Sequence, residues 1–253
     1  MRIALTTLFL SAVCGAQTIT TIAGTGVAGA ADGKMDQPFG LAIGPDKALY
    51  YCEVGNHRIV RLDLKTKKST GVAEGLGEPY EIAFDKAGDL FFCDRTKHSV
   101  SRIDRKTKAI VVVAGTGAEG FGGDGGPAIQ AQFRQPHSIA FTPDQHLLIC
   151  DILNFRIRSL DLKSGTITTW AGTGKPGAGK RSPPPDGSPL AGAPLDGPRA
   201  LAIDKVGNYY LALREGNAIY RLDVKSGKIY LFAGTGEKGF TGDGGDAKKA
   251  KLS

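Results

Sequence analysis

Gln37-Pro-Phe-Gly-Leu-Ala-Ile-Gly-Pro-Asp46 is a stretch that recurs three more times, in modified form, along this chain. The later copies are E-P-Y-E-I-A-F-D-K-A from Glu78, Q-P-H-S-I-A-F-T-P-D from Gln135 and G-P-R-A-L-A-I-D-K-V from Gly197. The copies stay in register downstream, because an aspartate stands twenty-five residues after each of the four prolines. A repeat of this size indicates a solenoid, an array or a propeller.

Each copy predicts four short strands. The first follows the proline, and the second is an aromatic or aliphatic run such as Leu49–Cys52. The third alternates with period two, as in Arg58–Leu62, and a polar turn leads to the fourth, as in Thr166–Trp170. Strands this short bury both faces only if blades stack on one another. We therefore predict an all-β β-propeller with four four-stranded blades, at about 38–73, 79–114, 136–171 and 198–233.

The composition is compatible with this fold. Among 253 residues there are 36 glycines and 13 prolines beside 41% hydrophobic residues, which suits short strands joined by tight turns. The net charge of +7 is concentrated in hairpin turns such as Lys65–Lys68 and Arg105–Lys108. We interpret this charge as a solvated rim. A surface for nucleic acid is the alternative, but residues 1–16 have the form of an export signal, which argues against it.

The first sixteen residues have the form of a signal peptide. Arg2 supplies the positive start, Ile3–Val13 the apolar stretch, and Cys14-Gly15-Ala16 a small-x-small cleavage site. Cleavage after Ala16 predicts a secreted or periplasmic protein. Lipidation at Cys14 is the alternative, although Val13 fits the lipidation pattern poorly. The stretch is too short to span a bilayer and no other segment is apolar enough, so we expect no membrane span.

An Ala-Gly-Thr-Gly signature ends three of the predicted fourth strands and also occurs once before any first strand, at Ala23–Gly26. Residues 18–23 are therefore expected to form an unpartnered outer strand that completes a blade from the opposite end of the chain. Residues 237–253 correspond to a loop that leads into a further blade. We expect an open arc that is truncated at its C-terminal end and exposes an edge through which it self-associates. A complete four-bladed ring is the alternative.

These motifs resemble NHL repeats, with the consensus P-x-G-I-A-hydrophobic followed by L-Y-V-A-D-x-x-N-x-R-I. Close matches are Gly55–Ile59 and Asp151–Ile157, and looser ones are Lys97–Val100 and Gly216–Ile219. The Gly-Asp-Gly-Gly loops at Gly122–Gly126 and Gly242–Gly245 resemble the bacterial exported and teneurin-like branch. The resemblance implies a six-bladed ring, of which about two blades are missing. It specifies the fold and leaves the function open.

Two columns of the repeat suggest chemistry. Cys52, Cys93 and Cys150 occupy one position of successive blades, where disulfide geometry is unfavourable, so we predict free buried thiols. The acidic column that follows is Glu53, Asp94 and Asp151. We interpret these carboxylates as caps of local backbone amides.

Metal chemistry is the weaker interpretation. A lactonase-like cation site would use Glu81 and His137 near a channel mouth, but no asparagine joins them, and one histidine does not make a zinc site. Each Gly-Asp-Gly-Gly loop offers a single carboxylate, so its glycines are interpreted as providing positive φ angles in a long loop. We predict no catalytic residues, no metal ligands and no cofactor.

The position after each blade proline differs between copies, unlike the packing columns. It holds Phe39, Tyr80, His137 and Arg199, and Glu81 adjoins it. A rigid scaffold that presents varied residues at its rim commonly binds a ligand there. We therefore predict a non-catalytic scaffold that binds a protein, peptide or glycan through these five residues. The alternatives are a metal-dependent lactonase- or lyase-like propeller enzyme and a structural repeat segment of a larger envelope protein.

Overall fold

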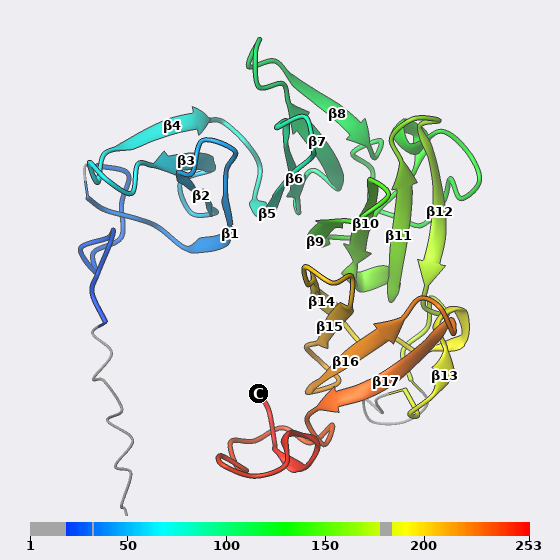
Figure 1. The fold of residues 1–253 in the computed structure, drawn as a ribbon. Coiled ribbons are helices and arrows are strands. Elements are labelled where there is room, and N and C mark those ends of the chain that lie inside the picture. Colours follow the sequence, from blue (N-terminus) through cyan, green and yellow to red (C-terminus); the bar gives the residue numbers. More distant parts are fainter. Residues whose placement is uncertain (1–18, 32, 178–183) are drawn as a thin grey trace, which may run out of the picture.

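The computed structural model describes residues 19–31, 33–177 and 184–253. The predicted signal peptide and Cys14 lie outside these residues. The chain forms four antiparallel sheets that follow one another around an open arc (Figure 1). The first two blades are β1 (Pro38–Ile43), β2 (Leu49–Glu53), β3 (Arg58–Leu62), β4 (Ser69–Ala73) and β5 (Pro79–Phe84), β6 (Leu90–Asp94), β7 (Ser99–Ile103), β8 (Ile110–Ala114).

The third blade consists of β9 (Pro136–Phe141), β10 (His146–Asp151), β11 (Arg156–Asp161) and β12 (Thr166–Ala171). The fourth consists of β14 (Pro198–Ile203), β15 (Tyr209–Leu213), β16 (Ala218–Asp223) and β17 (Lys228–Ala233), with the short β13 (Ser188–Pro189) beside β17. The remaining elements are single 3-10 turns: η1 (Ala128–Gln130), η2 (Ile152–Asn154), η3 (Leu190–Gly192) and η4 (Ala247–Lys249). The predicted all-β propeller architecture is confirmed.

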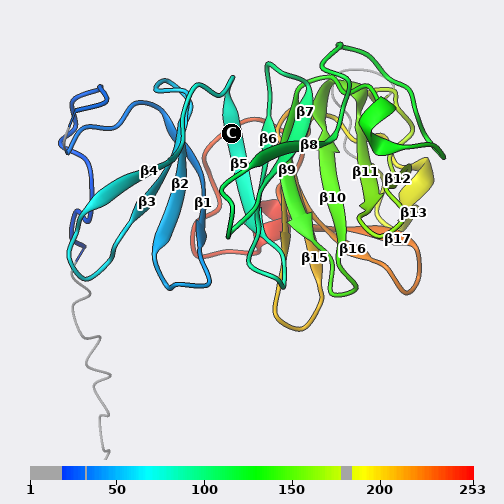
Figure 2. The same cartoon turned by 90° about the horizontal axis from the view of Figure 1, so that it is seen from above.

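The strands of each blade run from the inside of the arc to its outside. The first strands β1, β5, β9 and β14 contact one another in sequence around the inner wall. The fourth strands β4, β8, β12 and β17 lie on the outside (Figure 1), and Figure 2 shows the inner strands β5 and β9 upright along the axis of the arc. The chain therefore returns to the inner wall at each blade proline, which brings equivalent residues of successive blades side by side.

The hydrophobic core lies between the blades. Cys52, Cys93 and Cys150 are fully buried and unpaired, and burial raises the pKa of each thiol. The Cys93 thiol donates a hydrogen bond to the His137 carbonyl of the next blade at 3.1 Å. The predicted burial of this column is confirmed, and the cysteines act as small apolar packing residues.

The Ala-Gly-Thr-Gly signature reflects a close backbone approach. Gly115 follows β8 with a φ of 99°, and a Cβ there would lie 2.4 Å from the His98 carbonyl oxygen. Gly172 and Gly234 occupy the same place in the next two blades, with the same positive φ and the same contact. Only glycine fits this turn, which leads out of the blade into the connecting loop.

Three connecting segments share one motif, Asp-Gly-x-x-(Ala/Leu)-x-x-Ala-x-(Phe/Leu). We call them the first clasp (Asp124–Phe133), the second clasp (Asp186–Leu195) and the third clasp (Asp243–Leu252). The first two each pair with the outer strand of the following blade, through Gly125 N–H to the Ile167 carbonyl and Gly187 N–H to the Ile229 carbonyl, both at 2.8 Å. In the Gly122–Gly126 loop, Gly123 and Gly125 have the predicted positive φ angles of 82° and 80°, whereas Gly122 and Gly126 do not.

One predicted strand is not formed. Residues 19–23 were expected to make an outer strand, but the structure assigns no strand to them. A strand needs a neighbouring strand for its hydrogen bonds, and no further blade lies beside this segment in the described chain.

No helix among the described residues is long and apolar enough to cross a bilayer.

Candidate ligand-binding site at the mouth of the arc

The residues that follow the blade prolines form a continuous row on the inner wall. Phe39 and Tyr80, at the starts of β1 and β5, have ring centroids 4.4 Å apart. Tyr80 in turn meets His137 of β9 at 4.2 Å, with the rings inclined by 61°. Arg199 occupies the same position of β14 and lines the same hollow. The inner strands place these side chains side by side because each strand begins at the same height in its blade.

The row forms the wall of an open hollow of about 780 Å³. All five predicted rim residues line it. The other lining residues that the argument below uses are Arg214, Phe240 and Lys251. The hollow therefore extends from the inner strands to the C-terminal segment, which curls toward the inside of the arc (Figure 1).

Glu81 is the acidic group of this hollow. Its side chain lies over Gly40 of the preceding blade, where a Cβ would stand 2.4 Å from Glu81 Oε1. Burial raises the pKa of Glu81 to about 7, and a long hydrogen bond from the Ile82 amide, at 3.4 Å, opposes this rise. A carboxyl that titrates near neutrality in a hollow can donate or accept a proton there.

His137 is nearly buried between Tyr80 and Arg199. Burial, together with the positive charges of Arg199 and Arg95, lowers the pKa of His137 to about 3. The imidazole is therefore neutral near pH 7 and contributes a flat polar ring to the row instead of a charge.

Positive charge gathers at one end of the row. Arg199 forms no ion pair with any described residue, whereas Arg214 lies 3.7 Å from Glu215 and Lys251 lies 2.7 Å from Glu237. Arg95 stacks over the Tyr80 ring at 5.0 Å while it pairs with Glu78. The arrangement combines an aromatic surface with an uncompensated guanidinium, which suits a ligand that has a flat face and an anionic group.

All three carboxylates of the acidic column were predicted to cap backbone amides, and two of them do. Asp94 accepts hydrogen bonds from the amides of Gly77 and Glu78 at 2.7 and 2.9 Å, and Asp151 accepts one from the Arg134 amide at 2.7 Å. Glu53 instead binds side chains, those of Asn56 and Arg58. Among residues 19–31, 33–177 and 184–253, no group of three or more His, Cys, Asp or Glu side chains is arranged to hold a metal ion.

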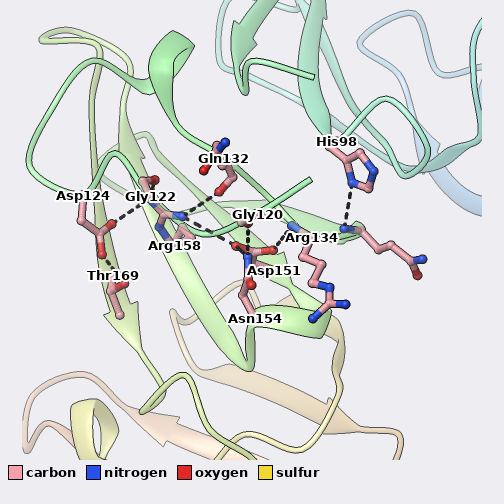
Figure 3. Close-up of polar contacts among 11 residues, drawn as sticks. His98, Gly120, Gly122, Asp124, Gln132, Arg134, Asp151, Asn154, Arg158 and Thr169 are labelled. Atoms are coloured by element: carbon pink, nitrogen blue, oxygen red, sulfur yellow. Dashed lines mark hydrogen bonds and ion pairs between the residues drawn. The ribbon is translucent and has the colours of Figure 1, made fainter. Parts of the chain in front are cut away.

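A second polar cluster holds the first clasp on the third blade (Figure 3). Arg158 of β11 is fully buried, 2.8 Å from Asp124 and 3.6 Å from Asp151. It also donates to the Gly122 carbonyl at 3.1 Å, and its guanidinium lies over the Phe133 ring at 5.5 Å. Thr169 completes the cluster with a 2.6 Å hydrogen bond to Asp124. The partners of Arg158 are held within the cluster, so we assign it a structural role.

Sequence analysis did not single out Arg158, Arg214 or Lys251. Arg158 stands in a column whose other members are Val60, Ser101 and Tyr220, so the repeat gives no sign of its charge. The sequence does contain one relevant pattern, the Asp-Gly-x-Pro shared by the first and second clasps. It indicates a recurring loop whose aspartate would bind a residue of the next blade.

No family model matches the sequence, and no curated protein matches it either. Solved β-propellers are similar in fold. An auxiliary nutrient binding protein from Bacteroides thetaiotaomicron matches with a TM-score of 0.59 and 22% identity, over 79% of this chain and 49% of that one. Virginiamycin B lyase from Staphylococcus aureus matches with a TM-score of 0.51 and 18% identity, over 77% of this chain and 55% of that one.

A gluconolactonase from Xanthomonas campestris is also similar, with a TM-score of 0.55 and 16% identity, over 79% of this chain and 63% of that one. The chain thus spans about half to two thirds of the length of these structures. At such identities the comparisons establish the β-propeller fold. The neighbours include both binding proteins and enzymes, so their functions do not transfer as a group.

Proposed function

We propose that this chain is the blade-bearing part of an exported, non-catalytic NHL-type binding protein, and that the row Phe39–Tyr80–His137–Arg199 is its ligand site. The signal peptide predicted at residues 1–16 supports export, and the repeat motifs support the NHL assignment within a six-bladed ring. The observation that carries the proposal is the contact of three rings from three successive blades along one hollow, beside Arg199, which forms no ion pair with a described residue.

The ligand class follows from this chemistry. A sugar ring or another flat apolar face packs on Phe39 and Tyr80, which are only partly buried. An anionic group binds Arg199, with Arg214 at the same end of the hollow. Neutral His137 offers one ring nitrogen as an acceptor between the two ends, because its other ring nitrogen hydrogen-bonds the Arg199 backbone. A glycan with carboxylate groups, or an acidic peptide segment, satisfies all three requirements. The similarity to nutrient binding propellers supports a glycan.

Isothermal titration with neutral and uronic-acid oligosaccharides of equal length tests the proposal. We expect binding of the acidic series only. Tyr80→Ala should weaken it about tenfold or more, because a partly buried tyrosine at the centre of a site carries a large share of the binding energy. Arg199→Ala should remove the preference for acidic ligands. Tyr230→Ala, on the outer strand β17, is the matched control and should leave binding unchanged. Equal binding by the wild type and the Tyr80 variant would contradict the proposal.

A propeller enzyme is the second candidate, and Glu81 is the observation that favours it. Its pKa of about 7 suits a general acid or base, and propeller neighbours of this fold include a lactonase and a lyase. Turnover of a lactone or ester by the wild type, lost in Glu81→Gln with ligand binding retained, would establish this candidate over the first.

A further inference from the structure

The outer edge of the second blade differs from the other outer edges of the arc. β8 is the last strand of its sheet, and no described residue pairs with its free side. Its Ile110, Val111 and Val112 are all exposed, at 46, 46 and 42%. The free edge of β4 in the first blade is polar, with Ser69, Thr70 and Gly71 at the same positions. An apolar, unpaired edge strand is a template for an added strand.

The third and fourth blades show what the same edge accepts. The first clasp pairs with β12 through the N–H and carbonyl of Ile167, which bond Gly126 and Gly125 at 3.1 and 2.8 Å. The second clasp pairs with β17 through the Ile229 carbonyl. Counted back from the alanine that ends each strand, Ile110 of β8 is equivalent to Ile167 and Ile229. Both occupants are extended segments of the same motif.

A groove between the first and second blades, next to the hairpin that leads into β8, corresponds to the space that a clasp fills elsewhere. Between the second and third blades, Ala128 of the first clasp is buried against Val113, Leu160 and Ile167. Leu190 of the second clasp takes the same place one blade later. Between the first and second blades the connection is only residues 74–78 and brings no clasp. An open groove of about 460 Å³ remains there, lined by Val72 and Ile103, the equivalents of Val113 and Leu160.

The charges of the groove define the occupant further. The hairpin before β8 carries Arg105, Lys106 and Lys108, none of which forms an ion pair with a described residue, and Arg105 and Lys108 line the groove. The aspartate of the second clasp accepts the Leu231 amide at 2.6 Å, and the equivalent amide on β8 is that of Val112. The groove is also lined by Asp46, which pairs with Arg61 at 2.6 Å, and by Asp104, which accepts the Lys106 and Thr107 amides. Its cations without an ion pair are therefore Arg105 and Lys108, and these suit an acidic segment. The third clasp of another copy suits it poorly, because its Lys248 and Lys249 would approach the same basic hairpin.

We propose that β8 and the groove beside it bind an extended acidic peptide segment of a partner protein, which adds a strand to the second blade. In this segment an aspartate stands four residues before a small aliphatic side chain, as Asp124 does before Ala128. The aspartate accepts the Val112 amide, the backbone pairs with Ile110, and the aliphatic side chain fills the groove. This surface lies on the outside of the arc and is separate from the hollow on the inner wall that contains Tyr80.

The test uses the full chain and an end-blocked peptide with the sequence of residues 123–131 in which glutamate replaces Gln130. At saturation, the peptide should slow hydrogen exchange of the Ile110 and Val112 amides at least tenfold. Val112→Pro removes one of these donors and should weaken peptide binding at least tenfold. Val72→Trp fills the groove without changing the edge and should have the same effect, which keeps the test valid if the proline variant fails to fold.

Two controls make the result specific. A peptide with lysine in place of the glutamate should bind more weakly, and Tyr80→Ala, at the mouth, should bind the peptide normally. The proposal is overturned if millimolar peptide leaves both amides unprotected, or if Val112→Pro and Val72→Trp bind as the wild type does. It is also overturned if sedimentation shows that the chain associates with itself through β8 and that the peptide does not compete, because the occupant is then a second copy.

Discussion

The first and third clasps belong to loops of nearly the same structure, and only the first packs against a further blade of the described chain. Both loops close with equivalent bridges, Glu119 to Phe133 and Lys238 to Leu252, and both hydrogen-bond the preceding Ala-Gly-Thr-Gly turn in the same way. Their side chains differ in environment. Phe121 is 45% exposed in the first loop, whereas the equivalent Phe240 is 84% exposed in the other. The backbone of this loop is therefore a local property, and the burial of its side chains depends on the next blade.

The two clasps differ most in their contact with a buried cation. Arg158 pairs with Asp124 of the first clasp, and no described residue has this role for the third clasp. Replacement of Arg158 by methionine should lower the free energy of unfolding by about 3–5 kcal/mol, since it leaves Asp124 and Asp151 without their buried cation. Urea denaturation at pH 7 measures the change. Arg221→Met, which removes an arginine that is partly exposed, should cost less than about 1 kcal/mol. A loss below 1 kcal/mol for Arg158→Met would remove the proposed distinction between the loops.

The hydrophobic residues that end the first and third clasps, Phe133 and Leu252, provide a matched pair. Phe133 is fully buried between blades and its replacement by alanine should cost about 3–5 kcal/mol, because it leaves a large cavity. The equivalent Leu252→Ala should cost less than about 1 kcal/mol, since that side chain is only partly covered. Thermal or urea unfolding of the two variants checks the contrast. Similar losses would mean that the third clasp is covered in solution.

Glu81 shows what burial does to a carboxyl that has no ion pair. Its pKa is raised like that of Asp151, but it is only partly buried and forms no ion pair with a described residue. Its pKa is about 7 in the folded protein against 4.5 in the unfolded chain, so the folded state is penalised as pH rises through this range. Glu81→Gln should therefore raise the unfolding free energy by about 3 kcal/mol at pH 8 and leave it unchanged at pH 4. Denaturation at the two pH values measures this, and an equal effect at both would contradict it.

The smallest expected difference in unfolding free energy is between variants of Asp124 and Asp243, the aspartates that begin the first and third clasps. Asp124→Asn weakens the ion pair with Arg158 and should cost about 1–3 kcal/mol. Asp243→Asn, at the same position of the third clasp, should stay within about 0.5 kcal/mol. Hydrogen exchange of the Gly115 and Gly234 amides, which bond η1 and η4 respectively, offers an independent comparison. We expect slower exchange at Gly115, because the third blade covers the first loop.

Much of the fold could be predicted from the repeat because the signal is local. Period-two alternation, the turn residues and the repeated proline give the strands, and the three cysteines mark a column with no room for polar atoms. The unformed strand at residues 19–23 shows the limit of such patterns, since strand-forming residues do not make a strand without a neighbour. The first clasp was predicted only as a loop and the second was not predicted, because both pair with strands about forty residues further along the chain.

The candidate site was predicted in composition but not in geometry. The varying column identified Phe39, Tyr80, His137 and Arg199, and Glu81 was added because it adjoins Tyr80. The structure brings all five to one hollow, and their role in binding stays a prediction. The contributions of Arg214, Phe240 and Lys251 could not be predicted, since they come from other strands and from the C-terminal loop.

By itself, the sequence determined the blades and their buried columns, because strand formation, tight turns and small-residue packing depend on neighbours within one repeat. Only the tertiary structure decided which side chains meet. The edge contact of Tyr80 with His137, the burial of Arg158 under the first clasp and the bare edge of β8 each arise from how successive blades are placed. Contacts between residues far apart in the chain depend on that placement, and the spacing of the repeat does not encode it.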